Sequence, residues 1–141
     1  MKRNIDSLKE LSFHQYSSLA LDDSGAVLPI ESKPNKKNVI YALVIDGVVS
    51  YIGKTNNLRK RINYYRTSIN RKDSHSDSNK SNHLICSLEK GQTVEVWFRQ
   101  CFIIPVKQDI GVLNISTMDI EEPHIIGIFK PIMNKHYVGR S

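Results

Sequence analysis

One carboxylate near the end of the chain stands on the apolar face of a predicted helix. Glu122 is followed at i+3, i+4 and i+7 by apolar residues, namely Ile125, Ile126 and Phe129, and this spacing is typical of one side of an α-helix. Proline is tolerated only in the first turn of a helix. Because Pro123 follows Glu122 directly, we expect the helix to begin just before Glu122 and to end by Lys130.

Two uses of Glu122 are open at this point. The helix dipole favours an acid in the first turn and keeps it ionised. Alternatively, a carboxylate on an apolar face, which is costly to bury unpaired, offers a hard oxygen ligand to Mg²⁺. The neighbouring Glu121 lies about 100° further around the helix, so we expect it to point to solvent.

Two tyrosines lie on a predicted β-hairpin. The runs VIYALVI and VVSYIG flank Asp46-Gly47, a strong signal for a tight turn between antiparallel strands. We predict strands near 38–45 and 48–53, with Tyr41 and Tyr51 on one face of the sheet near its rim. Tyrosines on strands most often only pack. Gly53 next to Lys54 allows a backbone to approach a ligand closely.

A basic helix follows the hairpin. Leu58, Ile62, Tyr65 and Ile69 recur at helical spacing and form one apolar stripe. Arg61 lies on the flank of that stripe, where it would border the sheet. The remaining cations of this region are predicted to bind the phosphate backbone of a nucleic acid or to be only surface charges; they are Arg59, Lys60, Arg66, Arg71 and Lys72.

Taken together, three blocks of the chain resemble the signature of the GIY-YIG nuclease family. The first is Val39-Ile40-Tyr41 with Tyr51-Ile52-Gly53, where Val replaces the first glycine of the signature. The second is Arg61, ten residues after Tyr51. The third is Glu122 with the apolar pair Ile125-Ile126, Pro131 and Asn134. The blocks come in the family's order over residues 38–135.

The resemblance implies an endonuclease that depends on Mg²⁺ or Mn²⁺ and hydrolyses phosphodiester bonds of double-stranded DNA. It implies that Glu122 holds the metal ion and that Tyr41 or Tyr51 helps to deprotonate the attacking water. Arg61 would clamp the scissile phosphate, and Arg61 and Lys54 would supply the cation that a basic phenol needs. Asn134 would orient the site, and either Lys80 or His83 would contact the phosphate.

Within that family the chain is similar to phage enzymes over essentially its whole length, from LALDDSG through the hairpin region to RQCF. This likeness implies a phage enzyme in the host cytoplasm that degrades host DNA containing unmodified cytosine. It also implies a homo-oligomer, which is a tetramer by resemblance, with a dimer as the alternative.

The elements that position these residues predict an α+β fold, a small antiparallel three-stranded sheet flanked by helices. The third strand is expected near 93–102, after a short helix in HLICSLEKG with Leu84, Ile85 and Leu88 inward. Residues 71–82 are expected to form a mobile loop, and the pattern of 105–117 predicts no particular structure. We divide the chain into an N-terminal extension, 1–37, and a nuclease domain, 38–141.

Composition limits the remaining possibilities. A chain of 141 residues suits one domain, and its net charge of +6 favours polyanionic partners. No apolar run is long enough to cross a bilayer and no signal peptide is evident, so we expect a cytoplasmic protein. His83 and Cys86 are spaced as a conceivable metal pair, but two buried thiols, Cys86 and Cys101, without zinc or a disulfide, are the favoured interpretation. The alternative functions are a non-catalytic nucleic-acid-binding module, or an interaction protein assembled through residues 1–37.

Overall fold

A five-stranded antiparallel sheet forms the centre of the molecule. The structure, a computed structural model, describes residues 4–29, 33–68 and 75–134, without the side chains at 28, 66–68 and 75–79. The strands lie in the order β2-β1-β5-β3-β4. Their bounds are β1 His14–Leu21, β2 Val27–Pro29, β3 Val39–Ile45, β4 Val48–Thr55 and β5 Val94–Gln100.

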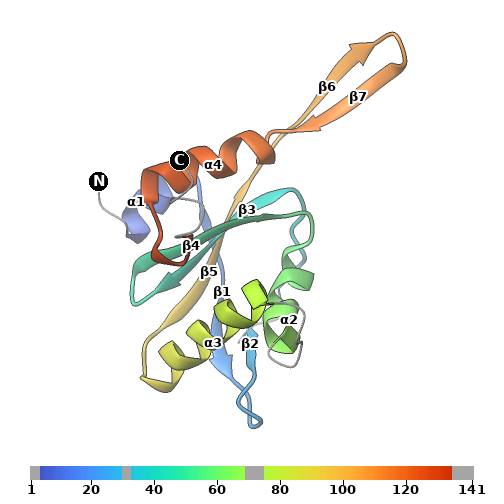
Figure 1. Cartoon of the computed structure of the whole chain (residues 1–141). Coiled ribbons are helices and arrows are strands. Elements are labelled where there is room, and N and C mark those ends of the chain that lie inside the picture. Colours follow the sequence, from blue (N-terminus) through green and yellow to red (C-terminus); the bar gives the residue numbers. More distant parts are fainter. Residues whose placement is uncertain (1–3, 30–32, 69–74, 135–141) are drawn as a thin grey trace.

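The helices lie on both faces of this sheet (Figure 1). On one face α2 and α3 cover an apolar cluster contributed mainly by β1, β2, β3 and β5, and on the other face α4 packs on β3 and β4, beside α1. The bounds of the helices are α1 Ile5–Glu10, α2 Leu58–Ser68, α3 His75–Glu89, α4 Met118–Phe129 and the short 3₁₀ helix η1 Ile132–Asn134.

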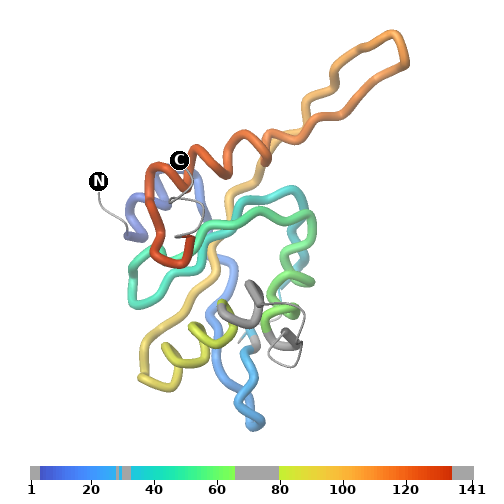
Figure 2. The backbone as a smooth tube through the Cα atoms, viewed as in Figure 1, coloured from blue at the N-terminus to red at the C-terminus, as the bar shows by residue number. Residues whose placement is uncertain are grey.

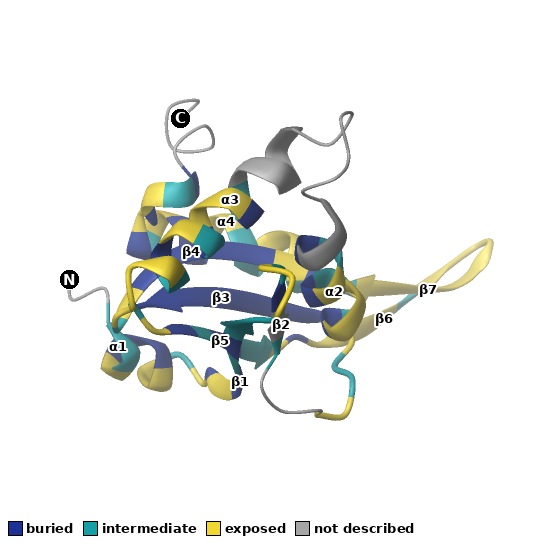
Figure 3. Cartoon of the chain, turned by 90° about the horizontal axis from the view of Figure 1, so that it is seen from below, coloured by how far each residue is buried: buried dark blue, intermediate teal, exposed yellow. Residues whose placement is uncertain are grey.

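Strand β3, which lies between β5 and β4, explains why the sheet is covered on both faces. All seven of its residues are buried, as expected of a strand covered on both faces. Successive side chains alternate between faces. Tyr41 and Leu43 therefore join the apolar cluster under α2 and α3, whereas Ile40 and Ala42 join the cluster under α1 and α4. Figure 3 shows β3 in the dark blue of buried residues.

The predicted hairpin is confirmed. β3 and β4 pair antiparallel, with Ile45 opposite Val48. Asp46 and Gly47 both have positive φ, 49° and 79°, which a two-residue hairpin turn of this kind requires. The third strand, β5, and the inward positions of the helix that ends before Gly91 also agree with the prediction.

The expected three-stranded sheet is wrong. Two further strands, β1 and β2, come from the segment set apart as an extension, and β1 pairs with β5 through partners such as Ser17 and Val96. Buried Phe13, Tyr16 and Leu19 anchor this segment in the two cores. Polar residues interrupt its apolar positions in the sequence, which is why the alternation of a strand was not apparent.

Two other local expectations are also wrong. Residues 75–82 belong to α3 rather than to a loop. Their short polar side chains do not favour a helix by themselves, so we attribute the helix to contacts with the rest of the molecule. Ser81, fully buried, donates a 2.6 Å hydrogen bond to the carbonyl of Tyr65 at the end of α2.

Helix α4 begins at Met118, so Pro123 lies inside it. Proline removes the hydrogen bond to the carbonyl of Asp119, which the packing of Ile125, Ile126 and Phe129 offsets.

The segment between β5 and α4 forms a separate hairpin. Strands β6 Ile103–Gln108 and β7 Gly111–Ser116 pair only with each other. The tube in Figure 2 shows this hairpin extending away from the rest of the molecule. Most of its residues are exposed, including many apolar ones. The sequence gives no prediction here because a pattern of apolar strands without a core partner is ambiguous.

Candidate active site

The hairpin β3–β4 brings the two tyrosines together on one face of the sheet. Tyr41 is opposite Gly53 and Tyr51 is opposite Leu43 in the register. Their ring centroids lie 5.9 Å apart with an interplanar angle of 48°. Both side chains are buried, at 2% and 5% exposure, so the predicted pair exists as expected.

Gly53 is required by the ring of Tyr41. A Cβ atom added at Gly53 would lie 2.7 Å from both Cζ and the hydroxyl oxygen of Tyr41, which is well inside van der Waals contact. The sequence suggested that this glycine admits a ligand. In the structure it admits a neighbouring phenol instead, and so fixes where that phenol lies.

Tyr41 is held as a neutral phenol. Its hydroxyl lies 2.6 Å from the hydroxyl of Tyr65 on α2. Burial, with the neighbouring phenols of Tyr65 and Tyr51, raises the pKa of Tyr41 well above its usual value, and the opposing effect of Arg61 is smaller. Tyr65 was read only as an apolar stripe residue, and nothing in the local pattern distinguished its hydroxyl.

Tyr51 has a different environment. The ammonium of Lys80 on α3 donates a 2.9 Å hydrogen bond to the Tyr51 hydroxyl, and its Nζ lies 4.4 Å from the ring centroid. A cation so close stabilises negative charge on the phenol oxygen. Of the two residues proposed for this position, Lys80 reaches the tyrosines, whereas His83 is exposed one turn further along α3.

Glu122 lies within the electrostatic reach of Lys80. The carboxyl is half-buried, and burial raises its pKa, opposed by Lys54 and Lys80 and reinforced by Asp119. The expected place of Glu122 at the helix terminus is wrong, because α4 starts four residues earlier, and burial is the largest effect on its pKa. Lys54 is held by Asp119 through a 2.6 Å ion pair.

The donor set around Glu122 fits a hydrated hard cation. No group of three or more His, Cys, Asp or Glu residues gathers anywhere among the residues that the structure describes. A site built on Glu122 would therefore offer at most two carboxylates of the described residues, with water and substrate oxygens as further ligands. This fits Mg²⁺, which keeps several of its waters, and does not fit structural zinc, which takes four protein ligands.

Asn134 fixes the edge strand of the sheet beside these groups. Its fully buried amide accepts a 2.9 Å hydrogen bond from the N–H of Ile52 and donates a 2.9 Å hydrogen bond to the same residue's carbonyl. Ile52 lies between Tyr51 and Gly53. The side chain thus supplies the pairing that a further strand would otherwise provide.

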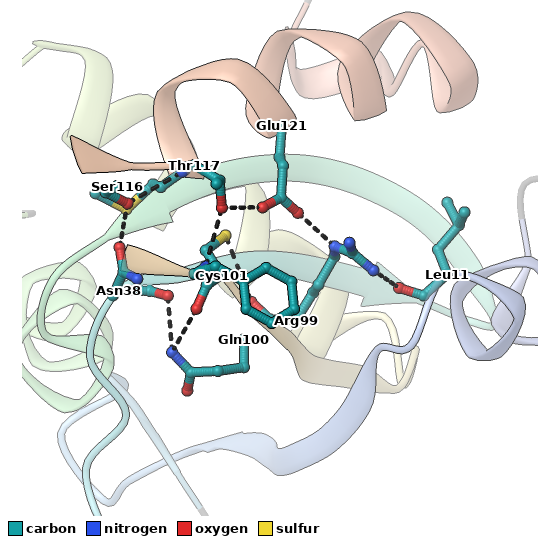
Figure 4. Close-up of polar contacts among 10 residues, drawn as sticks. Leu11, Asn38, Arg99, Gln100, Cys101, Ser116, Thr117 and Glu121 are labelled. Carbon is teal, nitrogen blue, oxygen red and sulfur yellow. Dashed lines mark hydrogen bonds and ion pairs between the residues drawn. The ribbon is translucent and has the colours of Figure 1, made fainter. Parts of the chain in front are cut away.

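The start of α4 is tied to the sheet by a polar network (Figure 4). Glu121 accepts hydrogen bonds from Thr117 and, at 2.6 Å, from Nε of Arg99 on β5, whose guanidinium also donates to the carbonyl of Leu11. The predicted solvent orientation of Glu121 is wrong, since its side chain is 16% exposed. Burial alone would raise the pKa of Glu121, but these hydrogen bonds outweigh it and lower the pKa.

The predicted DNA-binding cations fall into three groups. Lys60 is exposed and lines a pocket with Arg61, which is half-buried on the flank of α2 as expected. Arg59 is exposed, but its guanidinium donates to the carbonyl of Lys33. Arg71 and Lys72 lie outside the described residues, as does the side chain of Arg66.

The two thiols do not share one environment. Cys101 is buried, and burial together with Glu121 raises its pKa to about 12. Cys86 is exposed, so the expectation that both are buried is wrong. The cause is its position on the outer face of α3.

Comparisons with known proteins decide the family. No family model matches the chain. The chain is 51% identical over 125 residues to endonuclease II of Enterobacteria phage T4, which covers 89% of this chain and 91% of that protein. The solved structure of a glutamate-to-alanine mutant of bacteriophage T4 EndoII superposes with a TM-score of 0.85 at 48% identity, covering 92% of this chain and 97% of the other.

The chain belongs to the endonuclease II family. It is therefore an endodeoxyribonuclease, which confirms the prediction of an enzyme and disfavours a non-catalytic binding module. The restriction endonuclease HPY188I, solved with product DNA, shares the fold at a TM-score of 0.56 and 17% identity over 91% of this chain and 80% of the other. Among the described helices none is long and apolar enough to span a membrane.

Proposed function

We propose that this endonuclease cuts double-stranded DNA by a metal-dependent mechanism of the GIY-YIG type. The observation that carries the proposal is the position of Lys80, which is hydrogen-bonded to Tyr51 and acts electrostatically on Glu122. One lysine thereby connects the hairpin phenols with the carboxylate of α4. Two of the blocks recognised in the sequence, on β4 and α4, thus meet at this lysine of α3, and the remaining block, Arg61 of α2, acts electrostatically on Tyr41.

Glu122 is the proposed ligand of the divalent ion, Mg²⁺ or Mn²⁺. When bound, the ion neutralises charge on the scissile phosphate and orients the reactants. The half-buried carboxyl has a raised pKa in its absence, and a cation nearby favours the ionised form. The ammonium groups of Lys54 and Lys80 also favour the ionised form of Glu122. Lys54 is kept beside the site by its ion pair with Asp119.

Tyr51 is the phenol proposed to take the proton of the attacking water. Lys80 stabilises negative charge on its oxygen, whereas Tyr41 is held neutral by burial and Tyr65. Tyr41 is then a positioning residue, which contacts Tyr51 and is itself seated on Gly53. Arg61, which acts on Tyr41 electrostatically, supplies the planar donor for the phosphate.

The substrate proposed is host DNA that contains unmodified cytosine, cleaved in the cytoplasm of a phage-infected cell. The support is the relationship to a phage endonuclease over 89% of the chain. The recognition of the base modification would have to come from surfaces beyond the catalytic centre.

The test is plasmid cleavage by the wild type and Glu122→Gln. We expect nicks or breaks with Mg²⁺, no product with EDTA, and no product from the variant although it still binds DNA. An active Glu122→Gln variant would overturn the metal site. Matched plasmids with unmodified and modified cytosine, compared at equal concentration, test the specificity, and equal rates would overturn that part alone.

Assembly as a homo-oligomer, a tetramer or a dimer, completes the proposal. One face of the β6–β7 hairpin carries the cross-strand pairs Ile104–Ile115 and Val106–Leu113, of which Ile104, Leu113 and Ile115 are 49%, 44% and 46% exposed. An isolated hairpin is marginal in water, so a second copy covering this face would stabilise it. Light scattering tests this, with Leu113→Asp expected to lower the molar mass; a monomeric wild type contradicts it.

A further inference from the structure

A basic pocket lies where β4 ends and α2 begins. It has a volume of about 320 Å³ and is lined by Thr55, Asn57, Lys60, Arg61 and Tyr64. None of these five residues is acidic, and neither is any residue of α2. The pocket therefore combines two cations with hydroxyl and amide groups, which is the chemistry that recognises a phosphate.

The positive charge of this pocket comes from side chains and not from the end of the helix. The first N–H groups of α2 are already engaged: Leu58 donates to the carbonyl of Lys36, and Arg59 donates to Asn35. The next, Lys60, donates to the side chain of Asn57. A bound anion would thus be held by the ammonium of Lys60 and the phenol of Tyr64, next to the guanidinium of Arg61 that is assigned to the scissile phosphate.

The pocket is connected to the phenols of the candidate active site. Arg61 lines it and also acts electrostatically on Tyr41. Along β4, Thr55 is four residues beyond Tyr51, which corresponds to about 13 Å at the rise of a strand. In duplex DNA this distance spans roughly two phosphates of one strand, because the strand winds around the axis while it rises about 3.4 Å per nucleotide.

We propose that this pocket binds a backbone phosphate of the DNA strand being cut, a few nucleotides from the scissile bond. Lys60 supplies the positive charge and Tyr64 donates a hydrogen bond. Arg61 lies on the side of the pocket that is next to the catalytic phenols. The inference rests on the proposed function for the place of the scissile bond, but the binding of the phosphate does not depend on the metal or on Glu122. A phosphate here fixes the strand in register with the phenols.

The test measures the binding of a labelled duplex by the full-length chain without divalent metal, as a function of salt. Each phosphate contact contributes about −0.9 to the slope of log Kobs against log salt. We expect Lys60→Gln to reduce the magnitude of that slope by about 0.9 and to weaken binding about 5- to 10-fold at moderate salt. Tyr64→Phe keeps the charge, so we expect weaker binding with an unchanged slope.

Lys90→Gln is the matched control, because Lys90 is an exposed lysine that follows α3 and does not line the pocket. The inference is overturned if Lys60→Gln has the same slope as the wild type or as Lys90→Gln. In cleavage assays Lys60→Gln should raise KM with kcat within about 2-fold. A loss of kcat at saturating DNA would place Lys60 in the chemistry and also overturn the inference.

Free phosphate is distinguished from DNA in a separate arm. Inorganic phosphate, titrated at constant ionic strength, should compete with DNA no better than sulfate. If it binds at submillimolar concentration in a Lys60-dependent way while the DNA slope of Lys60→Gln is unchanged, the pocket serves free phosphate and the assignment to DNA fails. An active Glu122→Gln variant, by contrast, would overturn the proposed function and leave these slopes unaffected.

Discussion

The amide of Asn134 completes both backbone hydrogen bonds of Ile52, at 2.9 Å each. Ile52 belongs to β4, the edge strand of the sheet, and its neighbours in the chain are Tyr51 and Gly53. A residue 82 positions away therefore holds the backbone segment that carries the candidate catalytic phenol. The Asn134 amide therefore both stabilises the edge strand and positions Tyr51.

Replacing Asn134 by Ala should destabilise the chain. The substitution leaves a buried N–H and a buried carbonyl without partners, at a cost of about 1–3 kcal/mol for each. We expect the free energy of unfolding in urea to fall by roughly 2–5 kcal/mol. At low pH the protonated carboxyl of Asn134→Asp can accept from the N–H of Ile52 and donate to its carbonyl, so it should recover part of this loss; at high pH the carboxylate has no donor and should recover less. Equal stability of the three proteins would contradict this role.

The substitutions Gly53→Ala and Gly127→Ala form a matched pair of variants. At Gly53 the added Cβ would collide with the ring of Tyr41 at 2.7 Å, whereas nothing lies within 4 Å at Gly127 of α4. We expect Gly53→Ala to displace Tyr41 and to lower cleavage about 10- to 100-fold, as for a misplaced positioning group. Gly127→Ala should stabilise the helix by up to about 1 kcal/mol with unchanged cleavage. Single-turnover plasmid nicking and thermal melting measure the two effects.

The two tyrosines should differ in their response to loss of the hydroxyl. If Tyr51 takes the proton of water, Tyr51→Phe should lower the rate of cleavage about 10²- to 10⁴-fold, the range for general base catalysis. Tyr41→Phe removes a buried phenol that stays neutral, and we expect a loss of less than about 10-fold. Lys80→Met should resemble Tyr51→Phe, and the double variant should be no worse than the single ones. A larger loss for Tyr41→Phe would reverse the assignment.

The sequence predicted the parts of the fold that rest on local signals. The Asp46-Gly47 turn, the strand VIYALVI and the apolar stripe of α2 are each specified by neighbouring residues. The structure agrees with them, with the stripe tested only as far as Tyr65 because Ile69 lies outside the described residues. The errors share a different cause. Strand β1 is stabilised by β5, about 80 residues away, and the polar residues of α3 are held by a contact from Ser81 to α2. Such partners are absent from any local window.

The same division applies to the candidate site. The sequence predicted the main residues of the candidate site because they belong to the blocks that resemble the family. It did not predict the residues that hold them in place, namely Tyr65, Arg99 and Glu121. These contact residues on other helices and strands, and neither periodicity nor spacing indicates such contacts. Glu121 shows this most clearly, since helical geometry placed it toward solvent, whereas the side chain of Arg99 on β5 encloses it.

Glu122 should make the stability of the metal-free protein depend on pH. Its pKa is raised in the folded chain, mainly by burial. Between the unfolded and the folded pKa the folded state binds more protons, so the free energy of unfolding falls as pH rises through this window. We expect Glu122→Gln to melt at a higher temperature than the wild type at pH 8 in EDTA, and at the same temperature near pH 4. Glu10→Gln, at an exposed position of α1, is the control and should show neither effect.

The neighbouring Glu121 should show the opposite sign. Burial is outweighed by the hydrogen bonds from Thr117 and Arg99, and the pKa is lowered. The stability that Glu121 contributes is therefore present above the unfolded pKa and is lost as pH falls through the folded pKa. We expect Glu121→Gln to lower the free energy of unfolding by roughly 1–3 kcal/mol at pH 7, the range for hydrogen bonds to a charged group, and by less near pH 3. Arg99→Lys cannot reach both Glu121 and the carbonyl of Leu11, so it should reproduce most of the loss at pH 7.

The network around Glu121 fixes the start of α4 next to Glu122, so Glu121→Gln and Arg99→Lys should also need more Mg²⁺ for half-maximal cleavage. An unchanged Mg²⁺ requirement would mean that the network contributes to stability alone.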